Sequence, residues 1–317
     1  MSKKVIGLVG ARGYTGKELL GLILRHPELE LGFASSRELA GTAISDYVEG
    51  WPEDGKVFEQ VDPEELAQRE LDLCVLALPN GVGQRFVEAI DAAKNPMKIV
   101  DLSADGRFDD AWQYGWPERL REQISQASRI ANPGCYATGM QTALWPLVEQ
   151  LAAPPVVFGI SGYSGAGTKP SPKNDPENLR DNLLPYKLVE HTHEREVSRQ
   201  LGAQIYFTPH VASFFRGITL TISVQLEEST SAEALLARYR EVYADEPLVR
   251  VVDEIPVVRD AMQRHVVTVG GVQVDEAGEH AVILVTLDNL LKGAATQAMQ
   301  NINLLLGFPE HTSIPVE

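Results

Sequence analysis

Cysteine is scarce in this chain of 317 residues, which contains only Cys74 and Cys135. Two cysteines provide neither a disulfide framework nor a set of zinc ligands, so we predict a cytoplasmic protein without a metal site. Long hydrophobic runs are missing as well, since no segment approaches the ~18 apolar residues that a membrane span requires. The short "MSKK" before "VIGLVG" is too brief for a signal peptide, so we expect no membrane partner.

Positive charge is the third deficit. Lys and Arg number 28 against 44 Asp and Glu, which gives a formal net charge of −16. Such a charge disfavours nucleic acid and anionic membranes as partners, but it permits a small anionic substrate, because a few clustered cations can dominate one cleft. The composition, 44% hydrophobic and 23% charged, is that of an ordinary globular protein, and the length predicts about two domains.

Residues 3–37 have the pattern of a β-α-β unit: an apolar strand, a glycine-rich turn, an amphipathic helix and a second strand. The turn contains Gly10, Gly13 and Gly16, and "TGKE", which starts at Thr15, predicts a capping box at the start of the helix. Glycines at such a turn let the backbone approach a pyrophosphate, which the helix N-terminus then stabilises. The pattern therefore favours dinucleotide binding over a merely tight turn.

The end of the second strand indicates which dinucleotide is bound. NAD-binding folds usually have Asp or Glu there to hold the ribose 2′-hydroxyl, whereas this chain has Ser35, Ser36 and Arg37. Two hydroxyls and a guanidinium suit a 2′-phosphate, so we predict NADP (NADPH) as the cofactor; the alternative is a solvated loop.

Two later segments, "LDLCVLALPN" and "KIVDLSAD", are apolar runs typical of buried parallel strands. They predict a doubly wound, mainly parallel α/β Rossmann domain, with Cys74 as a core residue. The loops after them lie at the edge where such sheets bind ligands. The predicted cofactor contacts of this half are Gly10, Arg12, Gly13, Tyr14, Thr15, Gly16, Ser35, Ser36, Arg37, Pro79 and Ser103.

From about residue 155 the pattern changes to strict alternation. In "GITLTISVQL", residues 217–226, apolar side chains alternate with Thr, Ser and Gln, which predicts an antiparallel strand with one solvated face. "RHVVTVGGVQV" and "HAVILVTL" are predicted neighbours, and residues 231–244 are a predicted covering helix. This half therefore predicts an α+β domain with a mixed or antiparallel sheet. A C-terminal helix follows, with Gly307 at its C-cap and Pro309 beyond.

Cys135 lies in "ANPGCYATG", where Asn-Pro-Gly favours a turn and a helical pattern follows that must kink or end at Pro146. This arrangement puts Cys135 at a helix N-terminus, where the helix dipole favours a thiolate. A thiolate near a nicotinamide site predicts thioester chemistry, in which a covalent acyl-enzyme accepts or donates hydride. The alternative is a small buried structural residue, which is common for a free cysteine.

Thioester chemistry needs a proton carrier, and "KLVEHTHEREVSRQLG" contains His191 and His193. On a helix these two residues point about 200° apart, so both cannot face one cleft. His193 is in phase with the apolar Val189, Val197 and Leu201, so it is the predicted acid–base residue, with His191 as second choice. Surface or core histidines are the alternative, and a metal site is disfavoured because no His pair has i, i+4 spacing.

"GYSGAGTK", residues 162–169, is a glycine-rich loop after a predicted strand. Its amides and Ser164, with Lys169 nearby, could hold a phosphate or a carboxylate, and a plain turn is the alternative. Ser164 and Gly165 are also candidate cofactor contacts.

Two further segments supply polar candidates. "TPHVASFFRG" contains His210 and Arg216, of which Arg216 is a candidate anion clamp but equally an ordinary residue at the start of a strand. In "DNLLKGAA", Asn289 could orient the nicotinamide amide. The predicted substrate contacts are Asn132, Ser164, Lys169, His210 and Arg216.

Several segments in order, "GxxGYTGxEL", "DLSAD", "NPGCYAT", "GYSGAG", "HTHEREV", "TPH…RG" and "DNLLKGAA", make nearly the whole chain resemble the N-acetyl-γ-glutamyl-phosphate reductase family. The resemblance implies a Rossmann domain (1–131 plus 293–317), a catalytic and oligomerisation domain (132–292), and assembly into homodimers or tetramers. It also implies reversible NADPH-dependent reduction of an acyl phosphate in arginine biosynthesis. Cys135 would form the thioester, and His193 would protonate the developing alkoxide.

Three segments depart from the family's common pattern. Arg195 replaces a proline in "HTHERE", Thr168 and Lys169 follow the glycine loop in place of arginine, and the stretch between His210 and Arg216 differs. These differences leave open a related semialdehyde dehydrogenase that acts on a carrier-linked aminoadipyl or an aspartyl phosphate. A non-catalytic NADP-binding sensor with a structural Cys135 is the third alternative.

Overall fold

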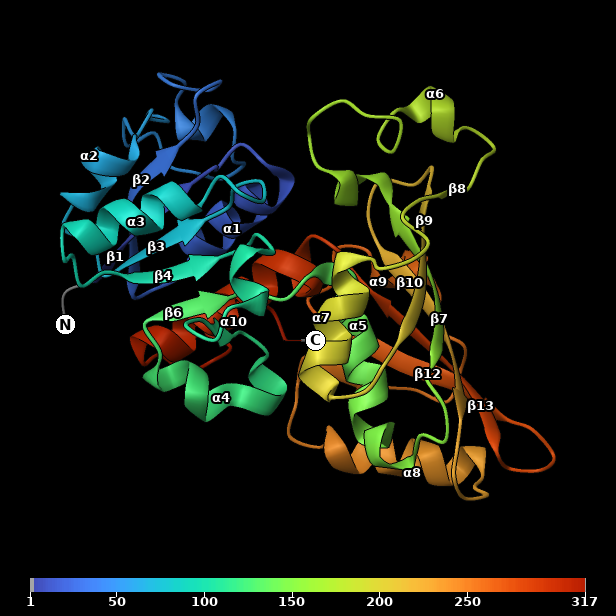
Figure 1. Cartoon of the computed structure of the whole chain (residues 1–317). Helices are drawn as coiled ribbons and strands as arrows, with labels where there is room; N and C mark the ends of the chain where they lie inside the picture. Colours follow the sequence, from blue (N-terminus) through green and yellow to red (C-terminus); the bar gives the residue numbers. More distant parts are fainter. Residues whose placement is uncertain (1–2, 317) are drawn as a thin grey trace. The chain divides into compact units, whose positions relative to one another are not determined.

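The computed structural model describes residues 3–316, and the chain forms two compact units (Figure 1). Among the described residues, the first unit contains 3–133 together with 294–315, and the second contains 134–293. The chain therefore leaves the first unit once and returns to it for its C-terminal helix.

The first unit is built on a six-stranded sheet in which every pairing is parallel. Its third strand is buried along its whole length, as expected for a strand covered on both faces. The predicted doubly wound α/β domain is confirmed. In spatial order the strands are β2 (Leu29–Ser35), β1 (Lys4–Val9), β3 (Leu73–Leu76), β4 (Lys98–Asp101), β6 (Arg129–Ala131) and β5 (Gln113–Tyr114).

Helices accompany these strands along the chain. They are α1 (Tyr14–Arg25), η1 (Ile44–Asp46), α2 (Pro63–Ala67), α3 (Gln84–Ala92), η2 (Asp105–Phe108), α4 (Pro117–Gln126) and α10 (Thr296–Leu306). α10 contacts both α1 and α4, and α2 packs with α3. The C-terminal helix ends as predicted, because Gly307 takes a left-handed φ of 78° at its C-cap.

The start of α1 differs from the prediction. The helix begins at Tyr14 with Gly13 as its N-cap, and no side chain caps it. Thr15 is already inside the helix, two positions past the N-cap, so the predicted capping box is wrong. The N-terminus of α1 is therefore not closed by a side chain of its own.

The second unit is built on a seven-stranded mixed sheet. β10 pairs antiparallel with both of its neighbours, as the alternating pattern predicts, whereas β7–β9 and β11–β12 are parallel pairs. The predicted α+β domain with a mixed sheet is confirmed. In spatial order the strands are β11 (Val249–Val251), β12 (Val267–Val274), β13 (His280–Leu287), β10 (Ile218–Gln225), β7 (Val156–Gly162), β9 (Tyr206–Ala212) and β8 (Leu184–Pro185).

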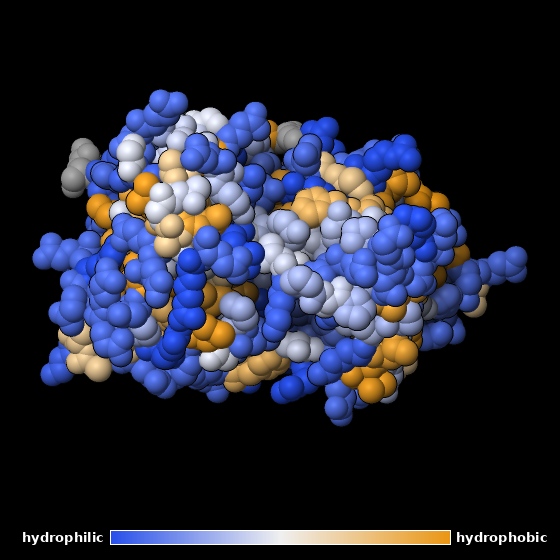
Figure 2. Space-filling view, turned by 90° about the horizontal axis from the view of Figure 1, so that it is seen from above, coloured by the Kyte–Doolittle hydropathy of each residue, from blue (hydrophilic) through white to orange (hydrophobic). Residues whose placement is uncertain are grey.

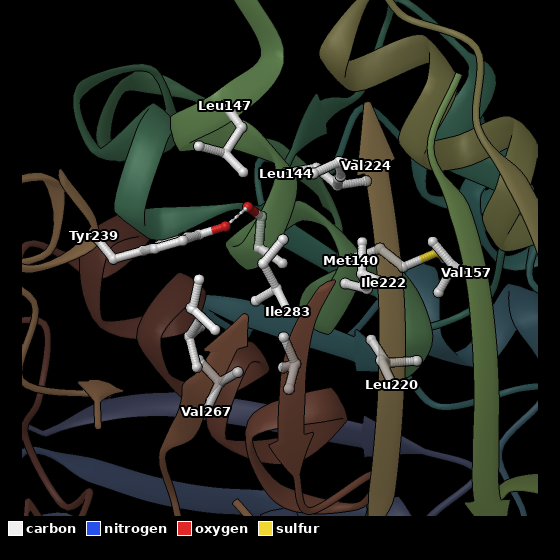
Figure 3. Close-up of a cluster of buried hydrophobic side chains, with 14 of the residues drawn as sticks. Met140, Leu144, Leu147, Val157, Leu220, Ile222, Val224, Tyr239, Val267 and Ile283 are labelled. Atoms are coloured by element: carbon white, nitrogen blue, oxygen red, sulfur yellow. Dashed lines mark hydrogen bonds between the residues drawn. The ribbon is translucent and has the colours of Figure 1, made fainter. Parts of the chain in front are cut away.

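One face of this sheet is covered by α5 (Cys135–Leu144) and α8 (Ala232–Val242), and α7 (Thr192–Leu201) packs beside α5. The inward side chains of β10, among them Leu220 and Ile222, share a core with Met140 of α5 (Figure 3). A 3-10 segment, η3 (Trp145–Gln150), follows α5, so Pro146 falls at the end of the helix as predicted. This core fixes α5, and hence Cys135, against the sheet.

The opposite face of the sheet carries exposed apolar side chains. Val156 is 51% exposed, Phe158 38% and Tyr206 49%. Val156 and Tyr206 are cross-strand partners of β7 and β9, so these side chains form one patch. We name Val156, Phe158 and Tyr206 the open-face patch.

Between β7 and α7 the chain makes an excursion, residues 163–190, at the end of the sheet near β8 and β9 (Figure 1). It contains η4 (Tyr163–Ala166), α6 (Pro176–Leu179) and β8. The other short elements of the chain are α9 (Val258–Ala261) and the π-helical turn η5 (Leu291–Ala295).

The surface is mainly hydrophilic on the face drawn in Figure 2, and apolar residues appear there in small groups. Within residues 3–316, no helix is long and apolar enough to cross a membrane.

Candidate active site

The glycine-rich turn of the first unit is built for close backbone approach. Gly10 has a left-handed φ of 84°, and a Cβ there would lie 2.2 Å from the carbonyl oxygen of Ala77. A Cβ at Gly16 would lie 2.6 Å from the carbonyl oxygen of Ala11. The turn leads into α1, which has no side-chain cap and no acidic residue in its first turn. These features fit the pyrophosphate of a dinucleotide, because the amides and the positive end of the helix dipole meet it without a competing carboxylate.

The end of β2 fits a phosphorylated ribose. Ser35 and Ser36 are buried there, and Arg37 is exposed beside them. The nearby carboxylate of Glu38 pairs with Arg12 at 2.8 Å. Since no acidic residue occupies the ribose-binding position at the strand end, these residues suit NADP better than NAD. The choice of residues stays a prediction.

Pro79 and Ser103 lie in two loops that are tied together. The amide of Gly81 donates to Asp105 at 2.7 Å, and that of Ala104 donates to Asn80 at 3.0 Å. The hydroxyl of Ser103 donates to the carboxylate of Asp101 at 2.6 Å and accepts from the amide of Asp105 at 3.1 Å. The Ser103 side chain therefore stabilises its own turn.

The Asn132 side chain is engaged within the first unit. Its side chain is buried in the first unit, where its amide oxygen accepts from Asn301 at 2.9 Å and its amide nitrogen contacts the carbonyl of Ala294 at 3.4 Å. Its own carbonyl accepts from Nε of Arg107 at 2.9 Å. Asn132 therefore holds α10 against the end of β6, and its role as a substrate contact stays a prediction.

Cys135 is the first residue of α5, as predicted. Gly134 is the N-cap with extended backbone, no side chain caps the helix, and no acidic residue lies in its first turn. The cysteine is partly exposed. The helix dipole therefore stabilises negative charge at the sulfur, which is the requirement for a nucleophile. Cys74, in contrast, is fully buried in β3, and burial raises the pKa of its thiol to about 12.

The π-helical turn packs directly on the cysteine. A Cβ at Gly293 would lie 2.8 Å from Cβ of Cys135 and 3.2 Å from the carbonyl oxygen of Asp288. Real Cβ atoms do not approach a carbon this closely, so only glycine fits. Gly293 therefore sets one wall of the space around Cys135.

The two histidines lie together, contrary to the helical argument. His191 is not inside α7 but is its N-cap, with extended backbone, and its Nδ1 accepts from the amide of His193 at 3.1 Å. The two ring centroids are 4.9 Å apart, and both rings contact Tyr136, the neighbour of Cys135, at 6.4 and 5.9 Å. The prediction that only one of them faces the site is wrong, because the helix begins one residue after His191. Val189, expected on the apolar face, is 74% exposed.

The environment distinguishes the histidines. Burial lowers the pKa of His191 to about 3, helped by the neighbouring His193, Lys187 and Lys173. His191 therefore stays neutral, and its Nδ1 is occupied as a cap acceptor. This leaves His193 as the better candidate for proton transfer, and that assignment stays a prediction.

Glu196 links α7, which carries His193, to the N-cap of α5, which begins at Cys135. It is fully buried, and its Oε1 accepts from the amide of Gly134 at 2.9 Å. The hydroxyl of Tyr136 donates to the carbonyl of His210 at 2.8 Å, and burial holds the Tyr136 pKa well above its usual value. Both contacts fix the backbone around Cys135.

Tyr186, from the excursion, completes this cluster. Its ring lies 5.6 Å from that of His191, and its amide donates to the carbonyl of Pro209 at 3.2 Å. Burial raises the pKa of the Tyr186 phenol, and the nearby Cys135 raises it further. A hydrogen bond with Tyr136 lowers it, but the pKa stays above its usual value. The aromatic rings therefore enclose the histidines on the side of the excursion.

Three amides of the glycine loop at 162–167 are engaged within the protein, and its role as an anion cradle stays a prediction. The amides of Gly162, Tyr163 and Ser164 donate to backbone carbonyls of residues 214–217. The hydroxyl of Ser164 accepts from the side chain of Asn289 at 2.9 Å, and Asn289 also accepts from the amide of Gly217 at 2.7 Å. Ser164 and Asn289 thus brace the end of β7 against β10. Gly165 and Lys169 are exposed at this loop.

Arg216 is held by a carboxylate. Its Nε lies 2.5 Å and a terminal nitrogen 3.1 Å from the two oxygens of Asp288, which is fully buried. An anion-clamp role for Arg216 therefore stays a prediction. The ring of His210 contacts that of Phe158 at 4.6 Å on the open face of the sheet, whereas the inward Phe207 contacts Tyr136. Strand alternation thus directs the His210 side chain away from Cys135.

Several site residues were missed at the sequence level: Tyr136, Tyr186, Glu196 and Gly293. Glu196 follows His193 by three residues and shares its helix face, which was a usable signal. Gly293 and Tyr186 reach the site only through the tertiary fold. In the part of the chain that the structure describes, no group of three or more His, Cys, Asp or Glu side chains is placed to hold a metal ion.

The chain is similar to known proteins over nearly its whole length. The semialdehyde dehydrogenase NAD-binding domain matches residues 5–127, and the semialdehyde dehydrogenase dimerisation domain matches residues 135–289. An N-acetyl-γ-glutamyl-phosphate reductase of Xanthomonas campestris pv. campestris is 53% identical over 309 residues, with 98% of each chain covered. One of Stenotrophomonas maltophilia is 53% identical over 312 residues, again with 98% of each covered. The aspartate semialdehyde dehydrogenase II of Vibrio cholerae, solved with ASA, has a TM-score of 0.78 at 19% identity and covers 97% of this chain and 99% of its own, which shows a shared fold.

Proposed function

The chain belongs to the N-acetyl-γ-glutamyl-phosphate reductase family of semialdehyde dehydrogenases, and on that premise we propose the reaction that it catalyses. It is the reversible, NADPH-dependent reduction of N-acetyl-γ-glutamyl phosphate to N-acetylglutamate γ-semialdehyde and phosphate, a step of arginine biosynthesis. The observation that carries the proposal is Cys135 at the uncapped N-terminus of α5, next in the chain to Tyr136, whose ring contacts both His191 and His193.

Cys135 acts as the nucleophile. Its sulfur forms a bond to the γ-acyl carbon, the bond from that carbon to the phosphate oxygen breaks, and phosphate leaves with the electron pair. The product is an acyl thioester on Cys135. The N-terminus of α5 stabilises the thiolate before attack, and Gly134 is held for this purpose by Glu196.

His193 moves the proton. NADPH, when bound, supplies the hydride that reduces the thioester. His193 gives a proton to the oxygen of the resulting hemithioacetal on Cys135 and takes it back when the carbon–sulfur bond breaks and the aldehyde leaves. His191 stays neutral throughout and orients His193 through the cap hydrogen bond.

The first unit holds the cofactor. Gly10, Gly13 and Gly16, with the N-terminus of α1, take the pyrophosphate, and Ser35, Ser36 and Arg37 take the 2′-phosphate. The open turn at Gly10 and the absence of an acidic residue in the first turn of α1 support this assignment.

A second copy of the chain covers the open-face patch in a homodimer. The patch lies within the residues that match a dimerisation domain, and its three side chains are 38–51% exposed. Phe158→Asp is expected to give monomers by light scattering, whereas Val57→Asp, at a 41% exposed valine of the first unit, leaves the dimer intact. A monomeric parent protein would exclude the dimer.

Both cysteines are free, which is consistent with a reducing compartment, and a cytoplasmic location stays a prediction.

The reverse reaction tests the proposed function. Purified protein is mixed with N-acetylglutamate γ-semialdehyde, phosphate and NADP, and nicotinamide absorbance is followed with Cys135→Ala as control. The proposal expects phosphate-dependent NADPH formation that the variant abolishes. Faster turnover of aspartate semialdehyde would assign an aspartyl phosphate as the substrate in place of N-acetyl-γ-glutamyl phosphate. Tight NADP binding without turnover, with Cys135 resistant to alkylation, would point to a sensor.

A further inference from the structure

Lys173 of the excursion lies close to the histidine pair. Its ammonium nitrogen lies 4.7 Å from the ring centroid of Tyr186, and that ring lies 5.6 Å from the ring of His191. Lys173 is half-buried. Its ammonium pairs with no carboxylate among residues 3–316. A half-buried ammonium without a carboxylate partner is available to an anionic ligand.

The position of Lys173 is built by its neighbour. Asn174 accepts from the amide of Ser171 at 2.7 Å, and its amide nitrogen donates to the carbonyls of Gly167 and Lys169, both at 2.8 Å. Leu179, the last residue of α6, is fully buried beneath the excursion. Lys173 is therefore carried by a folded turn that directs it over Tyr186.

Two carboxylates of α7, Glu194 and Glu196, accept hydrogen bonds from backbone amides. Glu194 accepts from the amides of Glu190 and Phe207, at 3.1 and 2.9 Å, and Glu196 accepts from that of Gly134. Lys187 adds a second cation of the excursion beside His191. Lys173 and Lys187 thus place two cations on the excursion side of the histidines even though the whole chain is strongly acidic.

We propose that Lys173 binds the carboxylate of the acyl substrate and so determines its specificity. The reacting acyl carbon must meet Cys135, and phosphate leaves beside it at the N-terminus of α5. The substrate's carboxylate lies several bonds further out, on the side where Tyr186 and Lys173 close the site. The name of the substrate rests on the proposed function, whereas anion recognition beside Cys135 is testable without it.

Alkylation of Cys135 gives the substrate-independent test. Iodoacetate carries a carboxylate and iodoacetamide is neutral, so the ratio of their rates reports the cation at the site. Lys173→Met is expected to lower the iodoacetate rate on the order of 3–10-fold and to leave the iodoacetamide rate within about twofold. Arg180→Met removes the same charge from an exposed pair with Glu177 and is the matched control. An unchanged ratio in Lys173→Met overturns the proposal whatever the substrate is.

Steady-state kinetics of the reverse reaction separate the carboxylate from phosphate. Lys173→Met is expected to raise KM for N-acetylglutamate γ-semialdehyde about tenfold, with little change in kcat or in KM for phosphate, and Lys173→Arg is expected to restore most of the loss. An increase confined to KM for phosphate would overturn the assignment to the carboxylate. Absence of turnover in the parent protein would refute the proposed function. The alkylation rates alone would then show whether Lys173 attracts an anion to Cys135.

Discussion

The Oε1 atom of Glu196 accepts a hydrogen bond of 2.9 Å from the backbone amide of Gly134, the N-cap of the helix that begins at Cys135. One buried carboxylate thereby ties the helix that carries His193 to the turn that carries Cys135. The relative position of the two reacting side chains depends on this bond.

Glu196→Ala is expected to lower kcat on the order of 10–100-fold, because loss of a buried bond to a charged acceptor costs about 1–3 kcal/mol and releases the cysteine turn. Glu196→Gln keeps an oxygen for the Gly134 amide and is expected to lose less. The iodoacetamide rate at Cys135, measured beside kcat, separates positioning from general destabilisation. Equal activities of the two variants would contradict this role.

Gly293→Ala is expected to lower kcat by a similar order without changing NADP affinity. A methyl group there would lie 2.8 Å from Cβ of Cys135. The added methyl group cannot be accommodated by a shift of Asp288, its other neighbour. Asp288 is held by Arg216 and by the amides of Gln263 and Leu290. Cys135 must therefore move.

A glycine of α1 provides the control for Gly293. The nearest atom to a Cβ at Gly21 is 3.7 Å away. Gly21→Ala is expected to keep full activity and to gain up to about 1 kcal/mol of stability. Wild-type turnover and titration by a thiol reagent in Gly293→Ala would show that the contact is relaxed without consequence.

His191 should make the protein sensitive to acid. Its pKa in the folded protein is lowered to about 3. In the unfolded chain His191 binds a proton near pH 6.5, whereas in the folded protein it stays neutral at that pH. Stability is therefore lost as pH falls from about 6.5 toward 3, by up to ~1.4 kcal/mol per pH unit from this group.

His191→Asn is the matched variant for this effect, because an Asn side chain also caps a helix but does not titrate. Between pH 7.5 and 5, the free energy of unfolding should fall by about 1–2 kcal/mol more in the parent than in the variant. Urea unfolding at several pH values measures this difference. Parallel pH profiles for the two proteins would mean that His191 titrates normally.

Arg37 should determine the cofactor preference. Arg37→Ala is expected to weaken NADP binding about tenfold, since a charged hydrogen bond to the 2′-phosphate is worth about 1.5–3 kcal/mol, and to leave NAD binding unchanged. Isothermal titration with both nucleotides measures it. Equal affinities of the parent protein for NADP and NAD would refute the assignment.

Local patterns were sufficient for much of this protein. Alternation in β10, the apolar run of β3 and the helix start at Cys135 each depend on near neighbours, and each was predicted correctly. The fold class follows from such patterns because period and burial are local properties.

Other features of the site depend on distant contacts or on the exact ends of helices. The side chain of Asn132 accepts a hydrogen bond from Asn301, 169 residues away, and no local pattern predicts that contact. The helical phase of His191 failed because α7 starts at Thr192, and helix boundaries vary by a residue or two in any pattern-based prediction. The contact of His210 with Phe158 was not foreseen, because the face to which a strand residue points depends on register with the rest of the sheet.

The central claim is that Cys135 carries the acyl group, and intact-protein mass spectrometry tests it most directly. The protein is mixed with N-acetyl-γ-glutamyl phosphate in the absence of nucleotide, quenched in acid and compared with Cys135→Ser. The account predicts one N-acetylglutamyl adduct, mapped to Cys135, that NADPH discharges and the variant lacks. Full turnover with no adduct, or an adduct on another residue, would contradict it.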